Sequence, residues 1–423
     1  MPELRKALSR PAVDASLHHP TVERGQGSWL CPLSSGSAAS NETCVQHPAR
    51  LPPNRPCQSI FSLSVIPHRK MAEYSADDEI ATFFKKTTTT RSQCETKARQ
   101  LTGSNKIEPV AIQGACSYTV YAGDRLEYVV QCRLSSLALK TELSDLATAV
   151  YGSFVPTVSL HGELGHGQDQ ESGKEPLLVY LMTRMPGITQ LDFILSHDVA
   201  QSSPEFFPSR QNFFADVASF LARSWLTPQN VSSEYRDKLK ASYLSDLHAL
   251  EEGLPERFKP AIQTCLRSLD DIMALPMVLL HKDFGSSNVL VEKDSCHLTG
   301  VIDWAEAAIG PFGTNLHSIQ SFAGSMHLRN GWTRFPDYEA FEQRFWSTLG
   351  TKVGGLSEET VISIKKARIL GLLLSHGFTS RLANEAAPTP LKDDDHGRYH
   401  TMYLDGYLVN PSTKMDGLSD AHD

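Results

Sequence analysis

The sequence lacks several features that would assign a protein to a class at once. It has no stretch of eighteen consecutive apolar residues, so no transmembrane helix is expected. It has no run of lysine and arginine, and its 40 basic and 48 acidic residues give a formal charge of −8. This mildly acidic balance argues against a nucleic-acid binder. Neither a membrane nor a nucleic acid is therefore an expected partner.

Paired cysteines are also missing. The eight cysteines include no CxxC motif. Cys31, Cys44 and Cys57 recur every thirteen residues, but no clustered histidine or cysteine completes a metal site with them. The first residues, MPELRKALSRP, have no apolar segment behind them, so no secretory signal is expected. Reduced thiols and a cytoplasmic location are the resulting expectations.

Residues 1–70 differ in composition from the rest of the chain. They hold 9 of the 24 prolines, and their 8 basic and 4 acidic residues leave a charge of −12 for residues 71–423. They show no sustained apolar periodicity, so they cannot bury enough surface to offset the entropy lost on ordering. We interpret them as a disordered extension and expect the folded part to begin near Met71.

The remainder predicts an α+β fold in two lobes. Residues 71–185 carry a β-hairpin signal, two further strands and short helices, and residues 186–423 are mostly helical by their three- and four-residue apolar spacing. The predicted strands are Ser117–Tyr121, Leu126–Leu134, Val155–Leu160 and Leu177–Thr183, and the predicted long helices are Phe207–Trp225, Ser233–Glu252, Glu256–Leu275, Tyr338–Leu349 and Ser357–Thr379. The segments Val278–Val291 and Leu298–Ile302 form a β-prone island among these helices.

This island contains the candidate catalytic and metal-binding residues. It contains His281, Asp283 and Asn288 in the pattern H-x-D-x-x-x-x-N between two apolar strands, and Asp303 ends a third. Phosphoryl transfer from ATP needs a carboxylate to accept the proton of the attacking hydroxyl, and an amide oxygen and a second carboxylate to hold Mg²⁺. The structural alternative is that His281 and Asn288 brace a buried turn while Asp303 caps the following segment.

These motifs resemble those of the aminoglycoside phosphotransferase family, which includes choline kinase relatives and has a protein-kinase-like fold. The resemblance covers roughly residues 75–380 and is most specific in the second lobe. The overall pattern of the sequence is similar to that of fungal members of the family. The other segments that carry it are Gln113–Val120, Tyr128–Arg133, Tyr151–Pro156 and Leu177–Gly187. The resemblance implies a small antiparallel sheet in the first lobe and a larger helical second lobe.

By this resemblance, Asp283 is the catalytic base, His281 orients the catalytic loop, and Asn288 and Asp303 hold Mg²⁺. Arg133 is the expected cation for the ATP phosphates, and Glu142 on the next helix is its possible partner. A surface arginine and a solvated carboxylate are the alternatives for these two. Gly114 and Ser117 are expected to cover phosphate with backbone N–H groups and a hydroxyl, although an ordinary turn would look the same.

The chain departs from the family pattern in three places. Lys282 and Phe284 stand where small or aliphatic residues are usual, and Asn315 follows Gly310-Pro311 where an aspartate is usual. Thr314 or Asn315 is a credible helix cap. Glu306, after Trp304, is a candidate to meet a cationic substrate, but a structural or solvent-facing role is also open.

The favoured function is ATP-dependent transfer of the γ-phosphoryl group to a hydroxyl of a small molecule. The alternative is a catalytically inactive pseudokinase that binds nucleotide or acts as a scaffold, which the thin phosphate loop and Asn315 would favour. A protein kinase is less consistent, because Asp-Trp replaces D-F-G and no A-P-E-like element follows Asp303. The identity of the acceptor and the oligomeric state stay open.

Overall fold

A computed structural model of the chain describes residues 75–165, 173–197, 200–327, 329–379, 386–394 and 397–416. All of them belong to the second of two units into which the chain divides, Gln58–Asp423. The expectation about residues 1–70 therefore lies outside the described residues. Within the described ranges, no helix combines the length and the apolar character needed to cross a bilayer.

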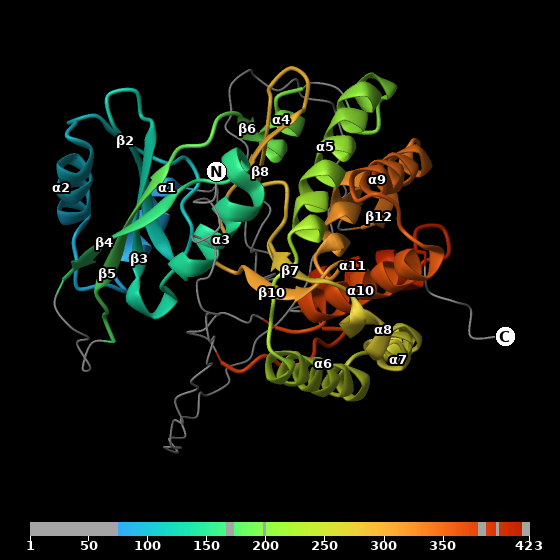
Figure 1. Ribbon diagram of the computed structural model, residues 1–423. Coiled ribbons are helices and arrows are strands. Elements are labelled where there is room, and N and C mark those ends of the chain that lie inside the picture. Colours follow the sequence, from blue (N-terminus) through green and yellow to red (C-terminus); the bar gives the residue numbers. More distant parts are fainter. Residues whose placement is uncertain are drawn as a thin grey trace, which may run out of the picture. The chain divides into compact units, whose positions relative to one another are not determined.

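The first lobe is built on a five-stranded antiparallel sheet (Figure 1). Its strands, in spatial order, are β1 (Ile107–Pro109), β2 (Ser117–Ala122), β3 (Tyr128–Leu134), β5 (Leu177–Thr183) and β4 (Val158–Leu164). The predicted hairpin is β2–β3, in which Ser117 lies opposite Arg133. This register places both proposed phosphate-binding residues at the same end of the sheet.

Local signals explain where the helices of this lobe begin. Helix α1 (Ala76–Phe84) is capped by Ser75, and α2 (Arg91–Thr102) begins with a reciprocal capping box between Thr90 and Gln93. The apolar spacing of Leu137–Tyr151 predicts a helix that begins at Leu137, but a 3₁₀ turn, η1 (Ser135–Leu137), comes first and α3 (Thr141–Tyr151) begins at Thr141.

A short segment joins the lobes after β5. The N–H of Arg184 donates to the carbonyl of Glu127 at 2.9 Å, and the Arg184 guanidinium lies 3.8 Å from the centre of the Tyr121 ring. Gly187 then adopts φ = 99°, and a Cβ there would lie 2.6 Å from the carbonyl oxygen of Val291. Only glycine fits this close crossing without strain. The chain then enters the second lobe through β6 (Ile188–Thr189).

The second lobe is mainly helical, as predicted. Its helices are α4 (Gln190–Leu195), α5 (Phe207–Leu226), α6 (Ser233–Gly253), α7 (Lys259–Arg267), α8 (Leu269–Ala274), α9 (Tyr338–Lys352), α10 (Glu358–His376) and α11 (Arg398–Leu404). The predicted helix Glu256–Leu275 is wrong as a single element. It divides into a 3₁₀ turn, α7 and α8, and the break is at Ser268, whose N–H is shared between the carbonyls of Thr264 and Cys265.

Short strands carry the β-prone island. β6 and β9 (Leu298–Val301) flank β8 (Val289–Val291) in one antiparallel sheet, while β7 (Met277–Leu280) pairs with β10 (Ala308–Pro311). A hairpin of β11 (Gly324–His327) and β12 (Gly331–Arg334) follows the 3₁₀ helix η5 (Leu316–Ala323). The sequence did not predict β10 or this hairpin.

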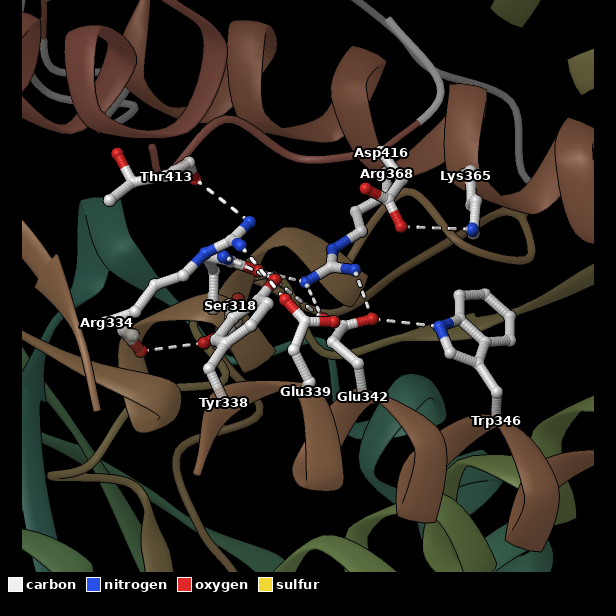
Figure 2. A network of polar contacts seen from close by, with 12 residues as sticks. Ser318, Arg334, Tyr338, Glu339, Glu342, Trp346, Lys365, Arg368, Thr413 and Asp416 are labelled. Carbon is white, nitrogen blue, oxygen red and sulfur yellow. Dashed lines mark hydrogen bonds and ion pairs between the residues drawn. The ribbon is translucent and has the colours of Figure 1, made fainter. Parts of the chain in front are cut away.

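A buried polar network connects α9, α10 and η5 (Figure 2). Arg368 forms an ion pair with Glu342 at 3.0 Å, and it also donates to the side-chain oxygen of Gln320. Glu342 in addition accepts hydrogen bonds from Trp346 at 2.9 Å and from Tyr338 at 3.1 Å. Burial would raise the pKa of Glu342, but the Arg368 charge and these donors hold it below its usual value.

Each lobe has its own hydrophobic core. One core joins α1 and α2 to the five-stranded sheet, and the other joins α3 to the helices of the second lobe. Tyr151 at the end of α3 belongs to the second core, where its hydroxyl donates to the carbonyl of Leu279 at 3.1 Å. These features confirm the predicted α+β fold, with a small antiparallel sheet before a larger helical lobe.

Candidate functional site

Asp283 and Asn288 lie in one loop between β7 and β8 and contact each other directly. The Asn288 side-chain amide donates from Nδ2 to the backbone carbonyl of Asp283 at 2.9 Å and to its Oδ2 at 2.8 Å. The loop closes on itself because the N–H of Asn288 donates to the carbonyl of Gly285 at 2.9 Å. The Asp283 carboxylate is therefore oriented by a residue of its own loop, while Oδ1 of Asn288 stays available as an acceptor.

Asp303 lies beside this loop. It follows β9, which pairs with β8, and the N–H of Ile302 donates to the carbonyl of Asn288 at 2.9 Å. Asp303 has φ = 61°, a left-handed conformation that is uncommon for residues other than glycine and is enriched for aspartate. The residue is exposed, and its carboxylate accepts no hydrogen bond from the described part of the chain. The strained backbone thus presents a free carboxylate next to Asn288.

The environment of Asp283 raises its pKa to about 6. The largest cause is the displacement of water by surrounding protein, followed by the negative charge of Asp303, with a smaller contribution from Glu306. The hydrogen bond from Asn288 acts in the opposite direction. Because Asp283 is exposed, solvent screens part of this effect. A carboxyl group with a pKa near neutrality is suited to accept a proton during catalysis.

His281 is a buried residue that connects the Asp283 loop to the end of β9. Its ring is 2% exposed, and Nε2 lies 2.9 Å from the carbonyl oxygen of Ile302. A carbonyl can only accept, so Nε2 carries the hydrogen of this bond. Burial lowers the pKa of His281. Nδ1 is buried and has no hydrogen-bond partner within the described ranges. His281 therefore ties the Asp283 loop to the strand end that presents Asp303.

Aromatic rings fill the space beneath these groups. Phe284 is 2% exposed and stacks on Phe220, with ring centres 6.0 Å apart. Trp304 packs edge-on against His281 at 4.7 Å, and its indole N–H donates to the carbonyl of Val301 at 3.0 Å. The large side chain of Phe284 is thus accommodated in the core. The loop is therefore packed on buried aromatic side chains, which hold its backbone in place.

Arg133 lies on β3 and is 7% exposed. Its Nε donates to the carbonyl of Leu137 in the η1 turn. The ion pairs of the described residues do not include one between Arg133 and Glu142, whose side chain is exposed on α3. The suggested pairing of these two residues is therefore not formed. Arg133 is also not a surface arginine, which was the alternative considered for it.

The turn before β2 is organised by Gln113, for which the sequence predicted no role. The side chain of Gln113 donates to the carbonyls of Val110 at 3.0 Å and Thr119 at 2.9 Å, and it accepts from the N–H of Thr119 at 3.0 Å. Ser117 is buried, with its hydroxyl 3.4 Å from that of Thr119. A Cβ on Gly114 would meet no atom within 4 Å, so no protein contact requires glycine there.

The same turn lies close to groups of both lobes. Burial raises the pKa of the Cys116 thiol, the charge of Arg133 lowers it, and the charges of Asp303 and Glu306 raise it. These electrostatic contacts show that Cys116 is near the β3 arginine and also near the two acidic residues of the second lobe. The turn before β2 therefore lies near the second-lobe segment that carries Asp303 and Glu306.

Asn288 and Asp303 are residues of this region that could hold a divalent cation. Both offer an oxygen with no hydrogen bond to it in the described part of the chain, and oxygen is the ligand atom that Mg²⁺ prefers. Across the described ranges, no group of three or more acidic, histidine or cysteine side chains is arranged to hold a metal. Magnesium in phosphotransferases commonly takes one or two protein ligands and completes its shell with phosphate and water, so the oxygen pair fits.

The segment after β10 is packed tightly, and its capping differs from the expectation. Asn315 occupies the N-cap position of η5, but its side chain makes no capping hydrogen bond. Thr314 donates instead to the carbonyl of Pro311 at 3.0 Å. Gly371 of α10 approaches so closely that a Cβ there would lie 1.6 Å from the carbonyl oxygen of Thr314. Helix packing, in addition to side-chain capping, holds this segment in place.

Several solved structures resemble this chain at low identity. They include a macrolide 2′-phosphotransferase from Brachybacterium faecium (16% identity, TM-score 0.42, covering 67% of this chain and 92% of that one). An aminoglycoside phosphotransferase from Streptomyces rimosus, solved with ADP and streptomycin, has 14% identity, a TM-score of 0.39 and coverage of 66% and 98%. An aminoglycoside-3′-phosphotransferase of type VIII has 19% identity, a TM-score of 0.39 and coverage of 66% and 97%. We infer nothing about substrates from likenesses this distant.

None of the curated proteins searched matches the sequence. Residues 134–343 match the phosphotransferase enzyme family, APH. The matched range contains His281, Asp283, Asn288 and Asp303, and it begins directly after Arg133, so Gly114 and Ser117 fall outside it. The chain therefore carries a domain of the phosphotransferase enzyme family, and the loop of Asp283 lies within that domain.

Proposed function

We propose that the protein transfers the γ-phosphoryl group of ATP to a hydroxyl group of a small molecule. The observation that carries the proposal is the state of Asp283. Its carboxylate is oriented by Asn288, and its pKa is raised to about 6 by the displacement of water and, to a smaller extent, by the charges of Asp303 and Glu306. The family match supports a phosphotransferase. ATP as donor and magnesium as cofactor are part of the proposal.

The proposed reaction uses the residues as follows. Asp283 accepts the proton of the acceptor hydroxyl as its oxygen attacks the γ-phosphorus, and the bond to the oxygen between the β- and γ-phosphorus breaks to release ADP. Asn288 and Asp303 would hold magnesium, which neutralises charge on the phosphate oxygens. His281 keeps the Asp283 loop in register with Ile302 and Asp303. Arg133 and the turn of Gly114 and Ser117 would face the phosphates from the first lobe.

A pseudokinase is the second candidate, and one observation favours it. Arg133 is buried, donates to the Leu137 carbonyl and forms no ion pair with Glu142 among the residues described. An arginine engaged in this way has fewer donors left for phosphate. Nucleotide binding without transfer to any acceptor would favour this reading.

ADP formation with a panel of hydroxyl compounds tests the proposal. The parent protein, Asp283→Asn and Asp303→Asn should be compared with Asp294→Asn as a control, because Asp294 is exposed in the turn between β8 and β9. We expect acceptor-dependent ADP formation by the parent protein and by the control. We expect a loss of about 10²–10⁴-fold in Asp283→Asn, the usual contribution of a general base. Equal turnover by parent and Asp283→Asn would overturn the proposal.

A further inference from the structure

A small cavity lies in the second lobe beside the catalytic loop. It has a volume of about 40 Å³ and is partly open. It is bounded by α4, the segment from Gln201 to the start of α5, the β8–β9 turn, the residues from the end of η5 to the start of β11, and Phe335 after β12. Its apolar lining includes Ile194 and the phenylalanines Phe193, Phe206, Phe213, Phe322 and Phe335. One water needs roughly 10–15 Å³ by this measure. The cavity is therefore sized for a short alkyl group or the edge of a ring.

One polar group of the wall has no partner. Gln190, the first residue of α4, is 7% exposed, and its Oε1 is buried without a hydrogen-bond partner among the described residues. A buried acceptor without a donor is unfavourable, and folded proteins rarely keep one without a reason. Gln190 belongs to the cavity lining, so an N–H or O–H donor on a molecule in the cavity would satisfy it.

The lining offers no uncompensated charge. Arg210 is its only ionised residue among those described, and it is ion-paired with Asp337. Arg210 also donates from Nη1 to the carbonyl of Gln201 at 2.6 Å, and from Nη2 to the carbonyl of Ser203 at 3.3 Å. No acidic side chain lines the cavity within the described ranges. An ammonium group would therefore lose its water without gaining a counter-charge, whereas an uncharged group would not.

The cavity wall touches the catalytic loop in two places. The N–H of Leu191, the residue after Gln190, donates to the carbonyl of Ser286 at 3.0 Å. On the other side, the ring of Phe322 packs against Phe284 with ring centres 6.0 Å apart. Ser286 and Phe284 are both in the loop of Asp283, so the cavity is separated from that loop by its own wall, through Phe322 on one side and the start of α4 on the other.

We propose that this cavity selects the acceptor. It takes a short uncharged alkyl part of the substrate that carries an N–H or O–H donor for Oε1 of Gln190. The inference rests on the proposed function and narrows it, because it favours neutral hydroxyl compounds over polycationic ones. Gln190 acts as a specificity residue and takes no part in the chemical step.

A series of N-(ω-hydroxyalkyl) alkanamides provides the probe. These compounds combine a hydroxyl acceptor, an amide N–H and an alkyl chain, and both the spacer and the acyl chain can be lengthened independently. The matching esters lack only the N–H. Gentamicin and streptomycin represent polycationic acceptors. Dissociation constants measured with the full chain by calorimetry, and phosphoryl transfer measured by ADP release, are the two readouts.

Three variants separate the contributions. Gln190→Leu removes the acceptor oxygen and replaces the amide with an apolar side chain of similar size, so the fold should tolerate it. Ile194→Trp fills the cavity, and Leu195→Trp is its matched control, because Leu195 is 43% exposed on the same helix and does not line the cavity. We expect the parent protein to bind an amide roughly tenfold more tightly than its ester. That ratio should fall to about one in Gln190→Leu. Ile194→Trp should remove the dependence on acyl chain length, and Leu195→Trp should behave as the parent.

Different outcomes address the pocket and the reaction separately. An amide preference that persists in Gln190→Leu, an absence of binding by every amide, or tighter binding of gentamicin or streptomycin than of every amide would overturn the inference. Amide binding that depends on Gln190 without any transfer would support the pocket and overturn the proposed function. Phosphoryl transfer that is insensitive to Gln190→Leu and Ile194→Trp would support the proposed function and overturn the inference about the pocket.

Discussion

The side-chain amide of Asn288 donates to both the backbone carbonyl and the carboxylate of Asp283, at 2.9 and 2.8 Å. Two bonds from a single nitrogen fix the relative orientation of the two side chains. They also leave the amide oxygen of Asn288 directed away from Asp283 and available to a cation. The same residue can therefore orient the proposed base and contribute a metal ligand.

Replacing Asp283 should separate activity from stability. Asp283→Asn removes the proposed base, but it also removes a carboxylate that is repelled by Asp303. We expect the loss of turnover to be accompanied by a small gain in the free energy of unfolding, no more than about 1 kcal/mol because solvent screens the repulsion. Urea denaturation measures the gain. An Asn variant less stable than the parent would contradict this account of the Asp283 pKa.

The pH profile of transfer should report the same group. The base must be ionised, so kcat/KM should fall as the pH drops below about 6. Glu306→Gln removes one of the charges that raise this pKa, so the acidic limb should move to lower pH. The pH dependence that Asp283 gives to stability is opposite to the one it gives to activity, because its pKa is higher in the folded protein than in the unfolded chain. It is favourable at low pH and is lost as the pH rises through about 6. An acidic limb unchanged in Glu306→Gln would contradict this assignment.

The Arg368–Glu342 pair should be strongly sensitive to single substitutions. Glu342→Gln leaves the Arg368 charge in a site where its side chain is 7% exposed. We expect a loss of about 3–5 kcal/mol in the free energy of unfolding, the usual cost of isolating one member of a buried pair. The exposed pair of Glu234 and Lys238 provides the control, and Glu234→Gln should change stability little. Equal losses in the two variants, measured by urea denaturation, would contradict the role of burial.

Two glycines in helices should respond oppositely to alanine. Gly371→Ala forces a Cβ into the carbonyl of Thr314, so we expect a loss of about 1–3 kcal/mol or more. Gly350 in α9 has no atom within 4 Å of the corresponding position, so Gly350→Ala should gain about 0.5–1 kcal/mol from helix propensity. Thermal unfolding of both variants tests the prediction. A neutral effect of Gly371→Ala would mean that α10 can move away from this segment.

Three histidines should make the second lobe sensitive to acid. Burial lowers the pKa of His317 to about 4 and also lowers those of His376 and His400, whose Nδ1 atoms are 3.4 Å apart. The unfolded chain takes up protons at these residues near pH 6.5, and the folded protein does not. Stability should therefore fall as the pH drops from about 6.5 towards 4.

His376→Phe should reduce this dependence because it removes one of the suppressed groups. His248→Gln is the control, since His248 is exposed on α6. The measurement is the melting temperature between pH 7 and pH 4.5. A drop of equal size in the parent and in His376→Phe would exclude the buried histidine as a cause.

Much of the architecture could be predicted from local patterns. The strand β5 and the helices α5, α6 and α10 match their predicted ranges to within a few residues, because their apolar spacing is regular. Strand β10 could not be predicted, because Ala308-Ile-Gly-Pro311 has no strand-like alternation and takes its conformation from pairing with β7. Pro260 marks the start of α7 in the sequence, but the break at Ser268 has no comparable signal, because the apolar spacing continues through it.

In the site too, some features follow from sequence spacing and others depend on tertiary contacts. Asp283, Asn288 and Asp303 were predicted as a group from their spacing between strands, and the structure brings them together. The bond from Arg133 to the Leu137 carbonyl depends on which way a buried side chain turns, which spacing does not specify. The cavity at Gln190 was not predicted because its walls come from segments spread along the sequence from Gln190 to Phe335.

The three-stranded sheet formed by β6, β8 and β9 has a mechanical consequence. β6 continues from the segment that joins the lobes, β8 follows Asn288 and β9 leads to Asp303, so one small sheet anchors all three. If the first lobe rotates about residues 184–187, this sheet stays fixed in the second lobe, and both candidate metal ligands stay fixed with it. Opening and closing over a nucleotide would then leave the spacing of the two oxygen atoms unaltered.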